Sequence, residues 1–357
     1  MTPPRVVHLA SGREWRGGQR QVWLLARELA RLGVPQLVVT SARGSLPERL
    51  RQDGIALRRV PWTAGLDPRV LPALVTELRA GPTLVHAHDA HAVTLGGVAA
   101  ALCRRPLVAT RRVDFHLRRR GYWGRAAGVI AISDAVARVL AEDGIAPERI
   151  HVVHSGIALE EVRRTARLGI RERLGLGGDA LIAANVAALV GHKDHATLVR
   201  AAGRLRDAIP SLHWVVAGEG HERASLERLR AELELDGRVH LLGHLDQPAR
   251  LIADANCFVM SSRDEGLGTS VLEAMALGIP VASTTAGGLP EMLQDGAGLL
   301  VPRGDPAALA AAVERLLREP TLARDIVTTA ERRVELFTAA RMAEAVRSVY
   351  RSLAPFP

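Results

Sequence analysis

Short apolar runs alternate along the chain with longer segments rich in alanine, leucine and arginine. The runs predict buried β-strands and the segments between them predict helices, the pattern of repeated β-α units around parallel sheets. In the first half the predicted strands are Val6–Ala10, Leu37–Thr40, Leu84–His86, Leu107–Thr110, Val129–Ile132 and Ile150–Val153. In the second half they are Leu181–Val186, Trp214–Ala217, Val239–Leu242, Phe258–Met260, Val281–Ser283 and Leu299–Val301.

Two such series predict an α/β protein with two doubly wound, Rossmann-like domains. We expect the N-terminal domain to cover residues 1–160 and the C-terminal domain residues 161–338. A last helix, Ala339–Leu353, follows the second series, and we expect residues 339–357 to cross back and pack on the N-terminal domain. Open α/β sheets bind ligands at the carboxyl ends of their strands, so the loops after strands are the candidate sites.

The composition suits two packed cores, because 48% of the 357 residues are hydrophobic. The net charge of +9 is uneven: residues 1–160 hold 23 Arg against 13 acids, whereas the rest hold 24 Lys and Arg against 25 acids. The positive charge of this half predicts binding to an anionic membrane surface or to an anionic acceptor, and a solvated arginine-rich surface is the alternative. Nucleic acid is not expected, because only 3% of residues are aromatic.

Neither a membrane anchor nor a disulfide framework is indicated. The first residues enter an apolar run without a charged leader, and no run reaches the roughly 18 apolar residues of a membrane span. The two cysteines, Cys103 and Cys257, lie far apart in apolar segments. We therefore expect a cytoplasmic protein, with peripheral contact at the inner face of the plasma membrane as a further expectation.

The segment around Glu265 is the most typical of a ligand site, because it follows a predicted strand and opens a helix. Gly266 and Gly268 allow close backbone approach, and the helix start offers N–H groups to an anion. Glu265 and Glu273 then suit sugar hydroxyls on the two sides of a diphosphate. For Glu273 a structural alternative is a capping box with Ser270.

This segment resembles the motif of two glutamates separated by seven residues in retaining family 4 glycosyltransferases of the GT-B fold. The resemblance extends over nearly the whole chain and implies two facing Rossmann-like domains, the first binding the acceptor and the second the nucleotide-sugar. It implies that Glu265 holds hydroxyls of the donor sugar and that Glu273 binds the ribose. The backbone expected to meet sugar and phosphate is that of Gly266, Leu267, Gly268, Thr269 and Ser270.

Lys193 is the only lysine among the 47 basic residues. A lysine is a compact point charge that suits a crowded phosphate, and by the resemblance it occupies the phosphate-binding position of the family. There it would neutralise charge on the leaving nucleoside diphosphate. A cation at a helix start opposes the helix dipole unless an anion is bound, which favours this role over a surface lysine. The family's arginine five residues earlier is Ala188 here, and His192 or an arginine of the first domain is expected to compensate.

Other loops resemble further parts of the family's site. Gly218 and Gly220 would lie beside the nucleotide, and His244 belongs to the loop whose backbone reads the base. Gly17 and Gly18 resemble the Gly-Gly loop that approaches the donor phosphates and the acceptor.

Two residues of the first half are candidates for the reacting centre. His88 is a candidate for the acceptor side, and Arg112 stands where many relatives carry a histidine, suited to a phosphate or an anionic acceptor. His86 and His88 also suggest a metal site, but no third ligand is apparent and no Asp-x-Asp motif occurs, so no metal is expected.

Basic residues flank Tyr122 and Trp123 between His116 and Arg125. Aromatic and basic side chains together suit a membrane interface, and a solvated loop is the alternative.

These features predict a metal-independent, cofactor-free retaining glycosyltransferase. It would move a sugar from a UDP-, GDP- or ADP-sugar to a glycan or lipid-linked acceptor in cell-envelope polysaccharide, glycolipid or lipopolysaccharide synthesis. Epimerases and phosphorylases share the fold, and a basic module that binds nucleic acid or a membrane surface is another alternative. A nicotinamide dehydrogenase is disfavoured because no Gly-x-Gly-x-x-Gly follows the first strand.

Overall fold

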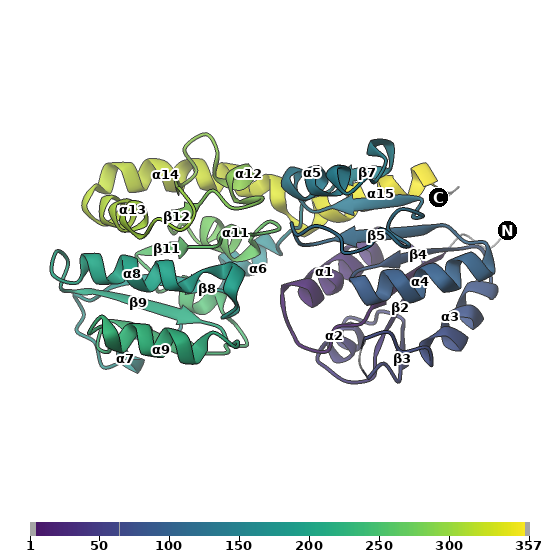
Figure 1. Cartoon of the computed structure of the whole chain (residues 1–357), viewed down its shortest axis with the longest axis horizontal. Helices are drawn as coiled ribbons and strands as arrows, with labels where there is room; N and C mark the ends of the chain where they lie inside the picture. The colour runs from purple at the N-terminus through teal and green to yellow at the C-terminus, as the bar shows by residue number, and fades with distance from the viewer. Residues whose placement is uncertain (1–4, 64, 354–357) are drawn as a thin grey trace. The chain divides into compact units, whose positions relative to one another are not determined.

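A computed structural model describes residues 5–63 and 65–353, so the ends of the predicted domain ranges, 1–4 and 354–357, lie outside the description. The chain divides into two compact units. The first unit is Met1–Gly156 with Thr338–Pro357, and the second unit is Ile157–Phe337. Each contains a parallel sheet covered by helices, which confirms the predicted α/β fold class (Figure 1).

The described part of the first unit has a seven-stranded sheet in the order β3-β2-β1-β4-β5-β6-β7, with every pairing parallel. Its strands are β1 (Arg5–Ala10), β2 (Gln36–Ser41), β3 (Leu57–Val60), β4 (Thr83–Ala87), β5 (Leu107–Arg111), β6 (Gly128–Ala131) and β7 (Ile150–Val152). The strand order reverses between β1 and β4, and ligands of such sheets bind at this point.

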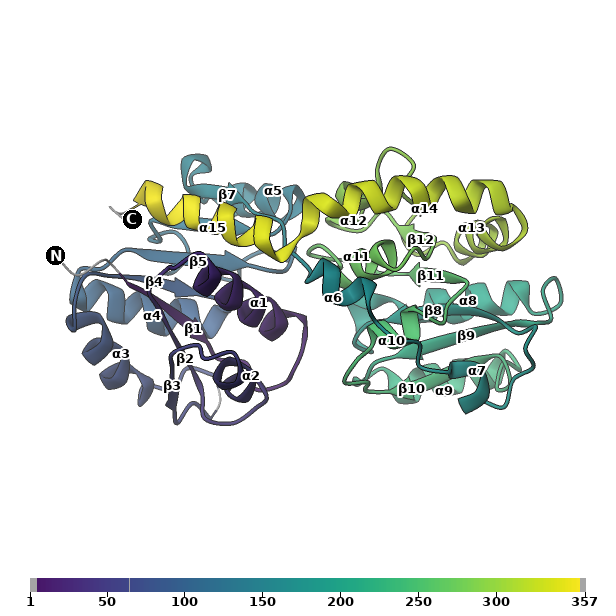
Figure 2. The ribbon, with the colours of Figure 1, turned by 180° about the vertical axis from the view of Figure 1, so that it is seen from behind.

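Helices cover both faces of this sheet. They are α1 (Gly17–Arg31), α2 (Leu46–Gln52), α3 (Val70–Arg79), α4 (Ala90–Cys103), α5 (Asp134–Glu142), the 3-10 helix η1 (Pro147–Arg149) and α15 (Ala339–Leu353). In Figures 1 and 2, α3 and α4 lie on one face, and α1 and α15 lie together on the other. The chain therefore returns from the second unit to complete the first, and α15 buries Tyr350 completely.

The described part of the second unit has a six-stranded parallel sheet in the order β10-β9-β8-β11-β12-β13. Its strands are β8 (Leu181–Val186), β9 (Leu212–Ala217), β10 (Val239–Gly243), β11 (Cys257–Met260), β12 (Val281–Thr284) and β13 (Leu299–Val301). Here the order reverses between β8 and β11.

The helices of the second unit again lie on both faces of the sheet, α8 and α9 on one and α10 and α11 on the other (Figures 1 and 2). They are α6 (Leu159–Arg163), α7 (Ile170–Arg173), α8 (His195–Leu205), α9 (Arg223–Glu232), α10 (Ala249–Ile252), α11 (Thr269–Ala276), α12 (Leu289–Leu293), α13 (Pro306–Arg318) and α14 (Pro320–Val334). The 3-10 helices are η2 (Gly191–Lys193) and η3 (Glu335–Phe337).

The apolar runs become strands because helices shield both sides of each sheet from water. Every residue of β9 is buried, and Trp214 in its middle is 1% exposed. A strand buried on both faces tolerates few polar side chains, so its sequence is nearly continuously apolar. The loops after such strands are held at fixed positions, and the candidate site residues lie in these loops.

Candidate active site

Lys193 and Glu265 meet at the carboxyl end of the second unit's sheet. Lys193 ends η2 after β8, and Glu265 lies in the loop after β11. These strands are neighbours at the reversal of strand order, where open α/β sheets bind ligands. The ammonium group of Lys193 donates to Oε2 of Glu265, and the two side chains are 17% and 10% exposed. The fold thus joins two residues that lie 72 positions apart into one ion pair.

Hydrogen bonds hold the loops around this pair. Ser261 Oγ donates to the carbonyl of Lys193 at 3.0 Å, and Ser262 Oγ donates to Oε2 of Glu265 at 3.4 Å. The N–H of Gly288, after β12, donates to the carbonyl of Glu265 at 3.0 Å. Three consecutive loops of the sheet edge therefore fix the position of one ammonium and one carboxylate.

The start of α8 does not leave Lys193 as an unopposed cation. Asp194 adopts a left-handed conformation with φ 46° and caps α8 by accepting from the N–H of Thr197 at 3.4 Å. Glu265 supplies a second carboxylate, directly to the ammonium group. The expectation that only a bound anion would offset this cation is wrong, because the protein provides its own carboxylates.

The first turn of α11, beside Glu265, has no side-chain cap. Its N-cap residue is Gly268, whose φ of 90° favours glycine and which has no side chain to accept from the first N–H groups of the helix; the N–H of Val271 donates to the carbonyl of Gly268 at 3.0 Å. Ser270 lies inside the helix, and the capping box with Glu273 is therefore wrong. Glu273 is 2% exposed. The helix start remains suited to an anion next to Glu265.

The loop after β9 packs tightly on the loop after β8. Gly218 has φ 155°, and a β-carbon there would lie 1.9 Å from the carbonyl oxygen of Ala187. A β-carbon at Gly220 would lie 2.1 Å from another carbonyl oxygen of that loop. The N–H of Gly218 donates to the carbonyl of Gly243 at 2.8 Å, next to the exposed His244. Both predicted glycines are thus required by backbone packing.

In the first unit, Gly17 and Gly18 begin α1 after the loop that follows β1. The N-cap residue, Arg16, provides no side-chain cap, and no acidic residue lies in the first turn. A cavity of about 410 Å³ opens beside this helix start. Its polar lining comes from loops and from the first turns of α1 and α4, and includes Arg13, Glu14, Gln19, Thr63 and His91. The cavity offers both hydrogen-bond donors and acceptors to a ligand.

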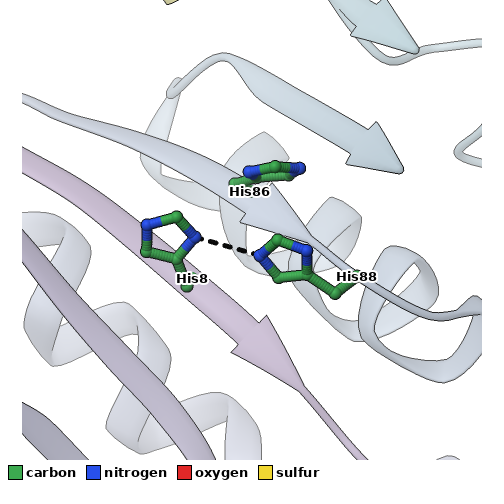
Figure 3. A group of neighbouring side chains, drawn as sticks. All are labelled: His8, His86 and His88. Carbon is green, nitrogen blue, oxygen red and sulfur yellow. Dashed lines mark hydrogen bonds between the residues drawn. The ribbon is translucent and has the colours of Figure 1, made fainter. Parts of the chain in front are cut away.

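Three histidines gather inside the first unit, from β1, from β4 and from the residue just after β4 (Figure 3). They are His8, His86 and His88, all buried, and one ring nitrogen of each lies within 4.8 Å of the others. The expectation that no third histidine accompanies His86 and His88 is wrong. His8 and His86 are register partners in adjacent parallel strands, a pairing that sequence order alone does not show.

His86 is held by hydrogen bonds at both ring nitrogens. Nε2 lies 2.6 Å from Oγ1 of Thr110 in β5, and Nδ1 lies 2.5 Å from the hydroxyl of Tyr350 in α15. Burial lowers the pKa of His86 well below its ordinary value, and the nearby His8 and Arg112 lower it further. His86 is therefore a neutral link between the sheet and α15.

His88 lies between His8 and Arg112. Its Nε2 is 3.0 Å from Nδ1 of His8, and Nη2 of Arg112 donates to its Nδ1 at 3.3 Å. His88 is 4% exposed, and burial together with the neighbouring histidines and Arg112 lowers its pKa well below the ordinary value. Burial lowers the pKa of Arg112 to about 10, so the guanidinium stays protonated at neutral pH. Two predicted site residues are thus hydrogen-bonded to each other.

The basic segment after β5 has its aromatic side chains inside the unit. Trp123 is 7% exposed and lies under the guanidinium of Arg111. The ring of Tyr122 packs against Gly97 of α4, where a β-carbon would lie 2.2 Å from it. The arginines at positions 118–120 and 125 are exposed, and Phe115, just before this segment, is 40% exposed. The predicted membrane contact therefore has charge and one exposed aromatic side chain to support it, and neither Tyr122 nor Trp123 is fully exposed.

Within the described residues, we find no helix that combines the length and the apolar character needed to cross a membrane.

Two protein-family models match the chain and together cover most of it. The description "Glycosyl transferases group 1" matches residues 167–333, and "Glycosyltransferase Family 4" matches residues 15–161.

Relatives and solved structures are similar to different extents. A D-inositol 3-phosphate glycosyltransferase of Streptomyces bingchenggensis is 30% identical, over 91% of this chain and 82% of its own. The Bacillus subtilis glycosyltransferase EpsD is 33% identical over 60% of this chain, which spans only 57% of the length of that relative. The crystal structure of Anabaena HepE with UDP-glucose has a TM-score of 0.86 and 21% identity, covering 98% of this chain and 99% of that one. At that identity the likeness shows the fold, which is GT-B.

Proposed function

The chain belongs to the family of group 1 glycosyltransferases and has the GT-B fold, and on this premise we propose that it is a retaining glycosyltransferase. It would move a sugar from a nucleotide-sugar to a hydroxyl acceptor. The second unit would bind the donor and the first unit the acceptor. The observation that carries the proposal is the Lys193–Glu265 pair beside the uncapped start of α11.

This arrangement offers complementary groups to the two halves of a donor. The diphosphate would accept hydrogen bonds from Lys193 and from the first N–H groups of α11, both of which favour negative charge. When the ammonium turns to the phosphate, the carboxylate of Glu265 can accept from hydroxyls of the sugar in place of Lys193. A donor thus replaces an internal ion pair with two interactions of its own.

The chemical step needs charge stabilisation and positioning more than a strong base. The bond between the anomeric carbon and the phosphate oxygen breaks with its electron pair on the phosphate. The acceptor oxygen attacks from the same face, and its proton passes to the leaving phosphate, so the configuration is retained. Lys193 would stabilise the charge that grows on the leaving group.

The remaining contacts to the donor are proposals from the family resemblance. Gly218 and Gly220 would lie beside the nucleotide, and the backbone at His244 would read the base. Glu273 would bind the ribose; its carboxylate is buried, so this assignment stays a prediction.

The first unit provides groups for an acceptor or for phosphate. Gly17 and Gly18 open α1 next to the cavity of about 410 Å³, and the side chain of Arg112 lies next to Gly18. We propose that the acceptor hydroxyl enters through this region. The D-inositol 3-phosphate glycosyltransferase named above favours a cyclitol phosphate, and a glycan or a lipid-linked glycan is proposed from the family resemblance. A location at the inner face of the plasma membrane would suit a lipid-linked acceptor and the basic first unit.

A nucleotide screen tests the donor assignment directly. Thermal unfolding is followed with UDP, GDP and ADP and their sugars, in the presence and absence of EDTA. One nucleoside diphosphate is expected to raise the midpoint by several degrees, because a ligand at roughly 100 times its Kd stabilises by about 2.7 kcal/mol. EDTA should not change the shift. The donor site is wrong if no nucleotide shifts the midpoint, and metal independence is wrong if EDTA abolishes the shift.

A further inference from the structure

The hydrogen bonds of His8 and His88 run in one direction. Arg112 has only donors, so Nδ1 of His88 must accept from it and the proton of His88 lies on Nε2. Nε2 of His88 then donates to Nδ1 of His8, which leaves the proton of His8 on Nε2. A guanidinium at one end thus sets the tautomers of both rings.

Gln36 of β2 lies at the other end of this chain of hydrogen bonds, near His8. Its amide nitrogen donates to the carbonyl of Ala26 at 2.6 Å, which points the amide oxygen the other way. That oxygen and Nε2 of His8 are both buried without a conventional partner among the described residues, and their interaction raises the pKa of His8 against the effect of burial. Gln36 thus offers an acceptor oxygen near the last donor, which agrees with the direction of the hydrogen bonds from Arg112 through His88 to His8.

Both histidines of this hydrogen-bond chain are neutral, so they add no positive charge beside Arg112, and His88 is able to accept from it. Burial lowers the pKa of His8 to about 3 and that of His88 well below its ordinary value. Arg112 forms no ion pair with any described residue. Asp89 attracts the guanidinium electrostatically and raises its pKa against the effect of burial, but its carboxylate accepts from the N–H and Oγ of Ser11 at 2.7 and 2.6 Å and forms no hydrogen bond with Arg112. The hydrogen-bond acceptor that holds the guanidinium is thus a neutral ring.

The cluster fits a hydrogen-bond chain better than a metal centre. Both nitrogens of His86 are already bonded, to Thr110 and Tyr350, and its ring is tilted over His88 with the centroids 4.0 Å apart (Figure 3). No carboxylate belongs to the group, and Arg112 would repel a cation.

The retained charge lies beside the amino end of a helix. Cδ of Arg112 is 3.9 Å from the position of a β-carbon at Gly18, in the first turn of the 15-residue α1. That turn has no side-chain cap and no acidic residue, so the helix dipole and the guanidinium both favour an anion at the same place.

We propose that His88 and His8 are positioning residues: as a neutral, tautomer-locked pair they hold Arg112, through a neutral acceptor in place of a carboxylate, for an anionic group of a substrate. The proposal rests on the proposed function for the identity of that substrate, a nucleoside diphosphate or an anionic acceptor. A histidine is suited to this task because it accepts one hydrogen bond and donates another without carrying charge.

Two substitutions separate positioning by a neutral group from simple packing. In His88→Gln the amide oxygen can accept from Arg112 and the amide nitrogen can donate to His8, so the neutral chain is restored. In His88→Glu the new carboxylate forms an ion pair with Arg112 and cancels its charge. We expect His88→Gln to bind inorganic pyrophosphate, measured by calorimetry, within about threefold of the wild type, and His88→Glu to bind it about tenfold more weakly or worse.

The matched control is the second histidine pair, His213 and His240, in neighbouring strands of the second unit. Their nitrogens are 3.2 Å apart, and both pKa values are lowered by burial. His240→Gln and His240→Glu should bind pyrophosphate with the same affinity as each other. Equal weakening by His88→Gln and His88→Glu, or wild-type affinity in His88→Glu, would overturn the proposal.

A measurement on the unaltered protein covers the case in which a variant does not fold. Nitrogen-15 NMR of the histidine rings should show His8 and His88 as neutral rings protonated only on Nε2 at neutral pH. An imidazolium or an Nδ1-protonated ring at either position would contradict the proposed hydrogen bonds from Arg112 through His88 to His8. Because neither tautomers nor pyrophosphate binding depends on turnover, failure of this inference is distinguishable from failure of the transferase assignment.

Discussion

Lys193→Ala is expected to lower kcat/KM for sugar transfer by about 10²–10³-fold or more, because it removes the cation placed to stabilise the leaving diphosphate. Glu265→Ala should have a comparable effect, because it removes the carboxylate that orients the donor sugar. Both variants should remain folded, since the side chains are still 17% and 10% exposed and water can reach the group left behind. A stability loss of about 1–3 kcal/mol is expected from the unpaired partner.

The double variant shows whether the two residues act as one unit. Groups that cooperate in one step are not additive, so Lys193→Ala with Glu265→Ala should be little worse than either alone. Transfer assays on the three variants, with circular dichroism to follow the fold, supply the comparison.

The matched control is Arg303→Ala. Arg303 is 53% exposed and donates to the carbonyl of Arg263 at 3.0 Å. Arg263 lies in the same loop as Glu265. Replacing Arg303 removes a cation that contacts this loop and leaves the Lys193–Glu265 ion pair in place, so transfer should stay within a few-fold of the wild type. If Lys193→Ala or Glu265→Ala transfers sugar as well as Arg303→Ala does, the pair is not the donor site.

Gly218→Ala is expected to destabilise the second unit by about 2–5 kcal/mol, the sum of a strained backbone and an overpacked contact. The residue has φ 155°, and the new methyl group would lie 1.9 Å from the carbonyl oxygen of Ala187. The loop after β8 would have to move, which would displace the backbone that precedes Lys193. Urea denaturation measures the stability loss, and nucleotide binding should weaken with it.

Gly237→Ala is the control for this change. Gly237 lies in the turn before β10, and a β-carbon there has nothing within 4 Å. Its unfolding free energy should change by less than about 0.5–1 kcal/mol. Equal stability of Gly218→Ala and Gly237→Ala would mean that the close approach of the two loops is not required.

Much of the architecture could be predicted because both sheets are buried on both faces. The predicted strands correspond to strands of the structure in every case, and the predicted last helix Ala339–Leu353 has the bounds of α15. The strand that was missed, β3, lies at the edge of its sheet. It contains Arg58 and Arg59, and Arg58 forms an ion pair with Glu77 at 2.7 Å. An edge strand is partly solvated, so an apolar pattern does not reveal it.

The site was predictable as a set of loops but not as a set of contacts. Lys193 was identified as the only lysine and Glu265 by its place between a strand and a helix, both with support from the family resemblance. Their pairing depends on β8 and β11 being neighbours, which is a property of the strand order. The same reason hid His8 from the sequence: it joins His86 and His88 only through the register of β1 and β4. The capping box failed because Gly268, and not Ser270, precedes α11.

A single labelling experiment tests the proposed reaction most directly. A nucleotide-sugar identified by the thermal screen, carrying carbon-13 at the anomeric position, is incubated with the protein and hydroxyl acceptors, and the products are followed by NMR. We predict that the label appears in a glycoside with the anomeric configuration of the donor, together with free nucleoside diphosphate. Label in a sugar phosphate, in an epimerised sugar or in a glycoside of inverted configuration would contradict a retaining transferase.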